Sequence, residues 1–263
     1  MSFEMKMTAI LLLKALDVSV LHRWRAANMN ETIRKRKSVR KYDMMKLDEQ
    51  TLENVKAQIG SLVPLYPDIR YSIEIADKTK GLFNVTAPHY LVFGSEEKEG
   101  ANENIGFIGQ QMDLYFAENG LGCCWLGASK PQEKEACPLP FVICMSFGKP
   151  AEPLHRGLSD FKRKTLSQIS EGTDERLEAA RLAPSGINAQ GWFFIAEDGK
   201  IHCYRKRHNL VMGLMLGRMS EIDLGIAVCH IYKESNGFKY EKEANAPEKK
   251  GFLYMGTVTG GLA

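Results

Sequence analysis

The sequence predicts an α+β fold in which one order of helices and strands occurs twice along the chain. Segments with the apolar spacing of an amphipathic helix alternate with short apolar or alternating segments, which are typical of strands. Val63-Pro64 in the first half matches Ala183-Pro184 in the second at an offset of 120 residues. Asn119-Gly120 likewise matches Asn236-Gly237 at an offset of 117 residues. The shared order favours an internal duplication, although two unrelated α+β halves would also produce it.

The first half contains two predicted helices and three predicted strands. Asp48 can cap the first helix, which stops near Gly60 and Pro64. Asn119-Gly120 can end the second helix, because glycine adopts the left-handed conformation common at helix C-termini. The apolar stripes are Leu52, Val55, Ile59 and Leu62 on one helix and Ile105, Ile108, Met112 and Tyr115 on the other, with strands expected at 71–75, 89–93 and 141–145.

The second half repeats this order. Thr173 can cap a helix that ends at Ala183-Pro184, since a residue before proline disfavours the helical conformation. Asp198-Gly199 lies between two apolar runs and predicts a tight hairpin, because both positions tolerate positive φ. The hairpin strands are expected at 192–195 and 201–204, followed by a helix striped by Met219, Ile222, Ile226 and Cys229, the Asn236-Gly237 stop, and a last strand at 251–255.

The composition is that of an ordinary globular protein, with 263 residues of which 44% are hydrophobic and 25% charged. A net charge of +3 is too small for a dedicated nucleic-acid-binding protein. Basic residues nevertheless cluster at 34–41, 162–164 and 205–207, so local cationic pockets are expected. The six cysteines form no C-x-x-C pair, which favours reduced thiols in a cytoplasmic protein and argues against a metal site.

Residues 1–28 are predicted to be an N-terminal extension. Their apolar run at 8–13 is interrupted by Lys14 and Asp17 and is too short to span a bilayer, so no membrane segment is expected. Met29-Asn30 resembles a new beginning, in which Asn30 can cap a helix.

The segment 34–42 places six cationic side chains and one hydroxyl within nine residues. Three explanations fit such a cluster: a solvated helix end, a nucleic-acid patch, or a cradle for a phosphorylated small molecule. By itself the cluster does not distinguish them, and a solvated charge run is the commonest case.

Two further segments contain residues suited to binding a ligand. The loop 183–192 follows a helix that stops at a proline and contains a serine, two glycines and two amides, which can hold a polar heteroaromatic ligand. The segment 120–128 joins a helix end to an apolar strand flanked by glycines, where backbone can approach a flat ligand closely. Each also has an ordinary explanation, as a self-capped loop and as a helix-to-strand turn.

Together these segments resemble the nitroreductase family of FMN-dependent oxidoreductases and, within it, the single-chain TM nitroreductase group. The loop 183–192 is similar to the family pattern A-P-S-S/A-x-N-x-Q-P-W, with Gly191 in place of the proline. It follows the basic segment by about 150 residues, whereas in the family it comes soon after it. The other matching segments are Arg36-Lys37-Ser38-Val39-Arg40-Lys41-Tyr42 and the ranges 87–93, 121–127, 147–150 and 162–166.

The resemblance implies a nitroreductase-like sandwich, with a mixed, mostly antiparallel sheet flanked by helices and duplicated within the chain. In the family, FMN lies at a homodimer interface and the loop comes from the opposite subunit. We therefore expect a fused pseudo-dimer, acting as a monomer or forming a homodimer. Residues 29–155 would carry the phosphate cradle and residues 156–263 the loop, with one FMN per chain.

The same resemblance assigns the cofactor-binding residues. Those expected to hold the phosphate and ribityl end are Arg36, Lys37 (through its backbone), Ser38, Arg40 and Arg163, with Lys162 as a weaker candidate; those expected beside the ring are Leu126, Gly127 and Ala128 from one half and Ser185, Gly186 and Asn188 from the other.

The implied reaction is hydride transfer from NADH or NADPH through the flavin to an electron-poor small molecule such as a nitroaromatic or a quinone. Such chemistry requires no general acid or nucleophile, so no catalytic side chain and no metal ligand are predicted. The alternatives are a flavin-fragmenting relative and a protein that binds flavin without turnover. Nucleic-acid binding through the basic clusters is disfavoured.

Overall fold

The computed structural model describes residues 31–82, 84–133 and 137–263. The expected extension 1–28 and the helix cap at Asn30 lie outside the described residues. Within them, none of the helices combines the length and apolar character needed to cross a membrane.

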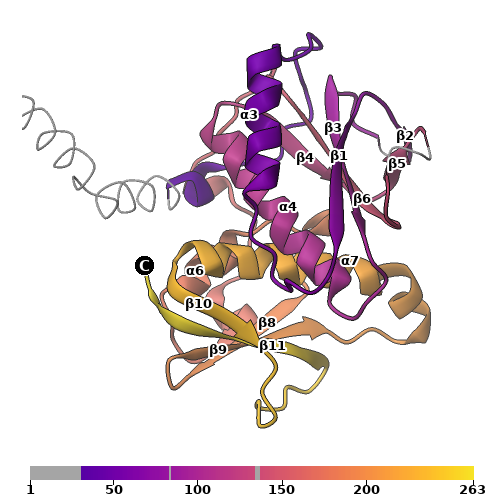
Figure 1. The fold of residues 1–263 in the computed structure, drawn as a ribbon. Helices are drawn as coiled ribbons and strands as arrows, with labels where there is room; N and C mark the ends of the chain where they lie inside the picture. The colour runs from indigo at the N-terminus through magenta and orange to yellow at the C-terminus, as the bar shows by residue number, and fades with distance from the viewer. Residues whose placement is uncertain (1–30, 83, 134–136) are drawn as a thin grey trace, which may run out of the picture.

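The described chain forms two main sheets with helices between and around them (Figure 1). The first sheet is antiparallel and has the order β1-β3-β6-β4. Its strands are β1 (Tyr71–Ala76), β3 (His89–Ser95), β6 (Phe141–Gly148) and β4 (Gly122–Leu126), with a separate two-stranded pair of β2 (Thr79–Gly81) and β5 (Ser129–Pro131).

The second sheet has the order β10-β11-β9-β8-β7, antiparallel except for the parallel pairing of β7 with β8. Its strands are β7 (Ser170–Glu171), β8 (Trp192–Glu197), β9 (Lys200–Lys206), β10 (Ser235–Glu241) and β11 (Phe252–Leu262). The expected α+β architecture with mostly antiparallel sheets is confirmed.

Both sheets follow the same strand order. The order β8-β9-β11-β10 repeats the order β1-β3-β6-β4. A long helix follows the second strand of each set in the chain: α4 (Ala101–Glu118) joins β3 to β4, and α7 (Leu210–Lys233) joins β9 to β10. A shorter helix precedes each sheet, α3 (Glu49–Gly60) and α6 (Arg176–Leu182). This shared order agrees with the duplication expected from the sequence, which remains an inference.

Helices α4 and α7 pack against each other between the two sheets (Figure 1). Their crossing is reciprocal: a Cβ at Gly106 would collide with the carbonyl oxygen of Ile222, and one at Gly225 with the carbonyl oxygen of Glu103. Each glycine therefore lies against the carbonyl three residues before the other glycine. The helices meet backbone to backbone, and any larger residue would force them apart.

Several local predictions are confirmed. The Asp48 carboxylate accepts the Thr51 N–H at 2.9 Å and caps α3. Gly120 has φ +75° just after α4, as expected for a helix stop. Asp198 and Gly199 have φ +50° and +74° at the turn of the β8–β9 hairpin.

Two helix boundaries were predicted wrongly. Helix α6 begins at Arg176, and its first N–H is accepted by Asp174 rather than by Thr173. Helix α7 ends at Lys233, so Asn236-Gly237 lies inside β10 instead of stopping the helix. The strand β10 was missed because its half-exposed residues alternate only weakly and the Asn-Gly pair suggested a turn.

Candidate functional site

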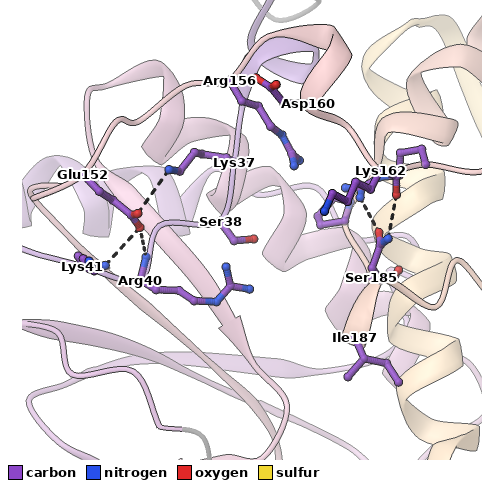
Figure 2. Close-up of a pocket in the computed structure, with 13 residues that line it drawn as sticks. Lys37, Ser38, Arg40, Lys41, Glu152, Arg156, Asp160, Lys162, Ser185 and Ile187 are labelled. Carbon is purple, nitrogen blue, oxygen red and sulfur yellow. Dashed lines mark hydrogen bonds and ion pairs between the residues drawn. The ribbon is translucent and has the colours of Figure 1, made fainter.

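A cavity of about 680 Å³ opens between three segments of the chain: 37–41, 152–163 and 184–188 (Figure 2). The cationic segment and the amide-bearing loop lie far apart in the sequence, yet they face the same space. Six cationic side chains and two carboxylates line it. This excess of positive charge suits an anionic ligand. The cationic residues are Lys37, Arg40, Lys41, Arg156, Lys162 and Arg163, and the acidic ones are Glu152 and Asp160.

Glu152 organises the cationic segment. Its carboxylate accepts the backbone N–H of Arg40 at 2.6 Å and that of Lys41 at 3.3 Å, and it lies 3.4 Å from the Lys37 ammonium (Figure 2). The amide hydrogen bond from Arg40 and the charge of Lys37 lower the pKa of Glu152. Lys37 is thus already paired, whereas the side chains of Ser38 and Arg40 remain available to the cavity.

Arg36 lies behind the cavity wall. Its side chain is 1% exposed, and its Nε lies 2.7 Å from Asp113 Oδ1 on α4. Its Nη2 donates to Ser38 Oγ at 3.3 Å. The structure therefore places Arg36 where it fixes the segment to α4 and orients Ser38, and not among the residues that line the cavity.

Arg156 and Arg163 carry charge that is poorly compensated. Burial and neighbouring guanidinium groups lower the pKa of each to about 10. Within the described residues neither has a carboxylate within ion-pair distance. The Arg156 guanidinium lies 3.7 Å from the centre of the Phe161 ring, and Arg163 Nη1 donates to Asn188 Oδ1 at 2.5 Å. Such groups gain most from a bound anion, because it supplies the missing counter-charge.

The loop after α6 is held in an uncommon conformation. Ile187, Asn188 and Gln190 have φ of +48°, +58° and +48°, values that non-glycine residues rarely adopt and that concentrate at functional sites. Ser185 Oγ accepts the Gln190 N–H at 2.9 Å, and Asn188 Nδ2 donates to the Lys162 carbonyl at 2.8 Å. The loop's polar side chains thus fix its own shape and attach it to the basic segment.

Four of the six predicted ring-side residues lie outside the lining of this cavity. Leu126 is buried in β4, and none of Leu126, Gly127, Ala128 and Gly186 lines the cavity. The methyl carbon of Met219 lies 2.8 Å from the position of a Cβ at Gly127 and 3.3 Å from that of one at Gly186. Gly127 and Gly186 thus both lie against the methyl of Met219.

Asp223, one helical turn after Met219, was missed by the sequence analysis. It is 5% exposed, and its Oδ1 accepts the Gly186 N–H at 2.8 Å. Burial raises the pKa of Asp223 to about 7, and the Gly186 hydrogen bond opposes that rise. The sequence signal that could have identified Asp223 was an acidic residue within an apolar helix. Arg156 was also missed. Its signal was its spacing of 120 residues from Arg36, which equals the spacing between Pro64 and Pro184.

Of the predicted site residues, the structure brings six to the cavity and leaves five outside its lining. Those that line it are Lys37, Ser38, Arg40, Arg163, Ser185 and Asn188; those that do not are Arg36, Leu126, Gly127, Ala128 and Gly186.

The family whose sequence model matches the chain is described as Putative TM nitroreductase, and the match covers residues 28–235. The structure is similar to that of a putative nitroreductase from Thermotoga maritima, with a TM-score of 0.59 and 20% identity over 88% of this chain and 91% of the other.

Two further solved structures match about half of this chain. A putative NADH dehydrogenase/NAD(P)H nitroreductase from Bacteroides thetaiotaomicron has a TM-score of 0.44 and 16% identity over 54% of this chain and 95% of the other. An FMN-dependent nitroreductase from Clostridium difficile has a TM-score of 0.38 and 16% identity over 50% and 93%. No curated protein matches the sequence significantly.

Proposed function

The chain belongs to the TM nitroreductase family, and from this premise we propose that it is an FMN-dependent oxidoreductase that passes electrons from NADH or NADPH to an electron-poor small molecule such as a nitroaromatic or a quinone. The observation that carries the proposal is the single cavity in which the cationic segment 37–41 faces the loop 184–188 across the basic residues of 152–163 (Figure 2).

The phosphate end of FMN fits the cationic part of this cavity. Arg40, Arg156 and Arg163 supply guanidinium groups, which bind phosphate oxygens through paired N–H donors. Ser38, oriented by Arg36, adds a short hydroxyl donor. The lowered pKa values of Arg156 and Arg163 support this fit, since a phosphate dianion would relieve the repulsion between them.

The ring end would take the place that the Met219 side chain occupies beside the cavity. Gly127 and Gly186 both present backbone without side chains to the Met219 methyl, and Met219 is a flexible thioether that can rotate aside and pack on an aromatic ring. When bound, FMN would supply the chemistry of accepting a hydride from a nicotinamide and handing two electrons to an acceptor. The chain's own residues bind, orient and shield the reacting groups from water.

We further propose that the chain is a pseudo-dimer of residues 29–155 and 156–263 with one FMN site. The shared strand order and the reciprocal crossing of α4 and α7 support this division. The place related to the cavity by that order is occupied by Tyr66 and Tyr240, whose hydroxyls both donate to Glu103. A second cofactor would find no room there.

The test is the flavin content of the purified protein. The expected result is a yellow protein with one FMN per chain, which bleaches with NADH or NADPH under nitrogen and recovers its colour with a nitroaromatic or a quinone. A colourless protein that takes up no added FMN would refute the proposal. Two FMN per chain would refute the single-site arrangement, and bound FMN that never bleaches would refute the oxidoreductase activity.

A further inference from the structure

Asp223 holds one carboxylate oxygen that the loop does not use. Oδ1 accepts the Gly186 N–H, while Oδ2 has no hydrogen-bond partner among the described residues. Oδ2 lies 3.7 Å from the position that a Cβ at Gly186 would take, on the side where the Met219 methyl lies. The residue is 5% exposed, so a ligand that reaches Gly186 would meet an acidic oxygen that no protein group among the described residues occupies.

The other half of the molecule shows that the loop itself needs no carboxyl at this place. Asn104 lies two residues before the crossing glycine Gly106, as Asp223 lies two residues before Gly225. The amide oxygen of Asn104 accepts the N–H of Leu65 at 2.8 Å and that of Tyr66 at 3.1 Å. The amide of Asn104 therefore accepts backbone N–H groups of the loop 62–66, as the carboxyl of Asp223 accepts that of Gly186.

We propose that Asp223 is a catalytic residue that delivers a proton to an electron acceptor bound beside Gly186, next to the cofactor ring. This inference rests on the proposed function and adds an acid to a reaction for which the sequence alone suggested none. Two observations separate this role from simple capping. At Asn104 the loop is held without an acid, and at Asp223 the carboxyl keeps one oxygen free.

The proton balance requires such a group. Reduction of a quinone to a hydroquinone takes up two electrons and two protons. The two electrons and one proton reach the quinone as a hydride from the reduced cofactor, whose electrons came from NAD(P)H. The second proton leaves the Asp223 carboxyl: its O–H bond breaks, a new O–H bond forms on the quinone oxygen, and the carboxylate left behind regains a proton from solvent. An acid is most effective when its pKa lies near the working pH, and that of Asp223 is about 7.

The charged groups on the neighbouring elements are engaged elsewhere. On α7 itself, Arg218 donates to the carbonyls of Phe141 and Val142, and Glu221 pairs with Arg205. On the facing helix α4, Glu103 accepts from two tyrosine hydroxyls. Beside the loop, Arg163 donates to Asn188. Burial is consequently the dominant cause of the raised pKa of Asp223, and no ion pair holds its carboxylate charged.

The test uses Asp223→Asn, the residue that the counterpart position carries naturally, so that the contact with Gly186 is retained. We expect this variant to keep its FMN content and its reduction by NAD(P)H, because neither step draws on the carboxyl. In single-turnover stopped-flow measurements, transfer from the reduced protein to 1,4-benzoquinone should slow about 100-fold at pH 7. The wild-type rate of this step should fall as pH rises through about 7, whereas the variant's rate should not depend on pH.

A second readout needs no turnover. In the wild type, the folded Asp223 keeps its proton up to about pH 7, while the unfolded aspartate loses it near 3.8. The free energy of unfolding of the wild type should therefore fall relative to that of Asp223→Asn between these pH values and level off above them. Asp223→Glu, which retains an acid, should restore part of the lost transfer rate.

The outcomes separate the two proposals. A wild type that neither binds FMN nor oxidises NAD(P)H would remove the proposed function and the role of Asp223 with it. A reducible wild type whose Asp223→Asn variant passes electrons to benzoquinone at an unchanged, equally pH-dependent rate would remove the role of Asp223 alone. If Asp223→Asn does not fold, NMR titration of the wild-type aspartate carboxyls decides, and a carboxyl that titrates near pH 4 would overturn the proposal.

Discussion

The two loops that follow α3 and α6 have equivalent places in the fold and opposite fates. In the second half, Gly186 follows Pro184 by two residues, and the methyl of Met219 lies 3.3 Å from the position of its Cβ. In the first half, Tyr66 follows Pro64 by two residues, and its ring packs against Gly100, whose Cβ would lie 2.8 Å away. Gly100 stands four residues before Asn104, as Met219 stands four before Asp223. In the first half the large residue (Tyr66) is on the loop and the glycine (Gly100) is at the long helix, whereas in the second half the glycine (Gly186) is on the loop and the large residue (Met219) is on the helix.

The difference shows how two loops at equivalent places in the strand order can border a cavity in one case and a packed polar cluster in the other. Around Tyr66, the carboxyl of Glu103 accepts hydroxyls from Tyr66 at 2.8 Å and from Tyr240 at 2.6 Å, and every group has a partner. Around the cavity, Arg156 and Arg163 have no carboxylate within ion-pair distance in the part of the chain that the structure describes, and burial lowers the pKa of both. Fully satisfied polar networks stabilise a fold, whereas uncompensated charge costs stability and favours ligands.

The largest expected effect comes from opening the closed half. Tyr66→Ala removes a partly buried aromatic ring and one of the two donors to Glu103, so the free energy of unfolding should fall by about 3 kcal/mol. Urea denaturation measures this change. Tyr66→Phe, which loses only the hydroxyl, should cost about 1–2 kcal/mol. Equal costs for the two variants would show that ring packing contributes nothing.

Closing the open half is the converse experiment. Gly186→Tyr introduces a ring where the first half carries Tyr66, and this ring would compete with the flavin for the space beside Met219. We expect FMN affinity to fall at least about 100-fold, or about 2.7 kcal/mol, with little loss of stability. Fluorescence titration of FMN measures the affinity, and Gly191→Ala, in the same loop but with open space around it, is the matched control. Undiminished affinity in Gly186→Tyr would place the ring elsewhere.

Substitutions of two arginines should separate a residue that binds FMN from one that supports the fold. Arg163→Ala should weaken FMN binding by about 1.5–3 kcal/mol, the usual value for a charged hydrogen bond, and leave the unfolding free energy nearly unchanged. Arg36→Ala should act in the opposite sense and mainly destabilise the fold, because it leaves Asp113 buried without its partner. The pair of measurements fails if Arg36→Ala binds FMN weakly while its stability equals that of the wild type.

The smallest effect, measured over one pH unit, concerns the pH dependence of stability. Burial raises the pKa of Glu103 to about 7 from 4.5, so the folded state holds a proton that the unfolded state loses in this interval. The unfolding free energy should therefore decline as pH rises from about 4.5 to 7, by at most about 1.4 kcal/mol per pH unit from this group. Glu103→Gln should reduce that slope. An unaltered slope in thermal melts would mean that Glu103 is ionised in the fold.

The sequence predicted best what depends on near neighbours. The α3 cap at Asp48 and the hairpin turn at Asp198-Gly199 follow from the chemistry of adjacent residues, and both are confirmed. Two of the three segments that form the cavity, 37–41 and 184–188, were also predicted, because their motifs are local even though their meeting is not.

What the sequence did not predict depends on how the halves pack. The sequence predicted Arg36 at the phosphate, and it did not predict that the Arg36 Nε would lie 2.7 Å from Asp113 on α4. Glu152 and Asp223 gain their positions only through contacts with residues more than 30 positions away, Arg40 and Gly186. No spacing rule connects such pairs, because the contact distances are set by the folded arrangement of α7 and the segment 152–163.

The glycine contacts between α4 and α7 fix how the molecule can accommodate ligands of different size. Walls on opposite sides of the cavity belong to opposite halves, and the two helices that join these halves touch without intervening side chains. Their spacing cannot be adjusted by rotamer changes, as it could at an interface cushioned by leucines. Variation in ligand size must therefore be absorbed by the loop 184–188 and the segment 152–163, and engineering of the acceptor range should begin there.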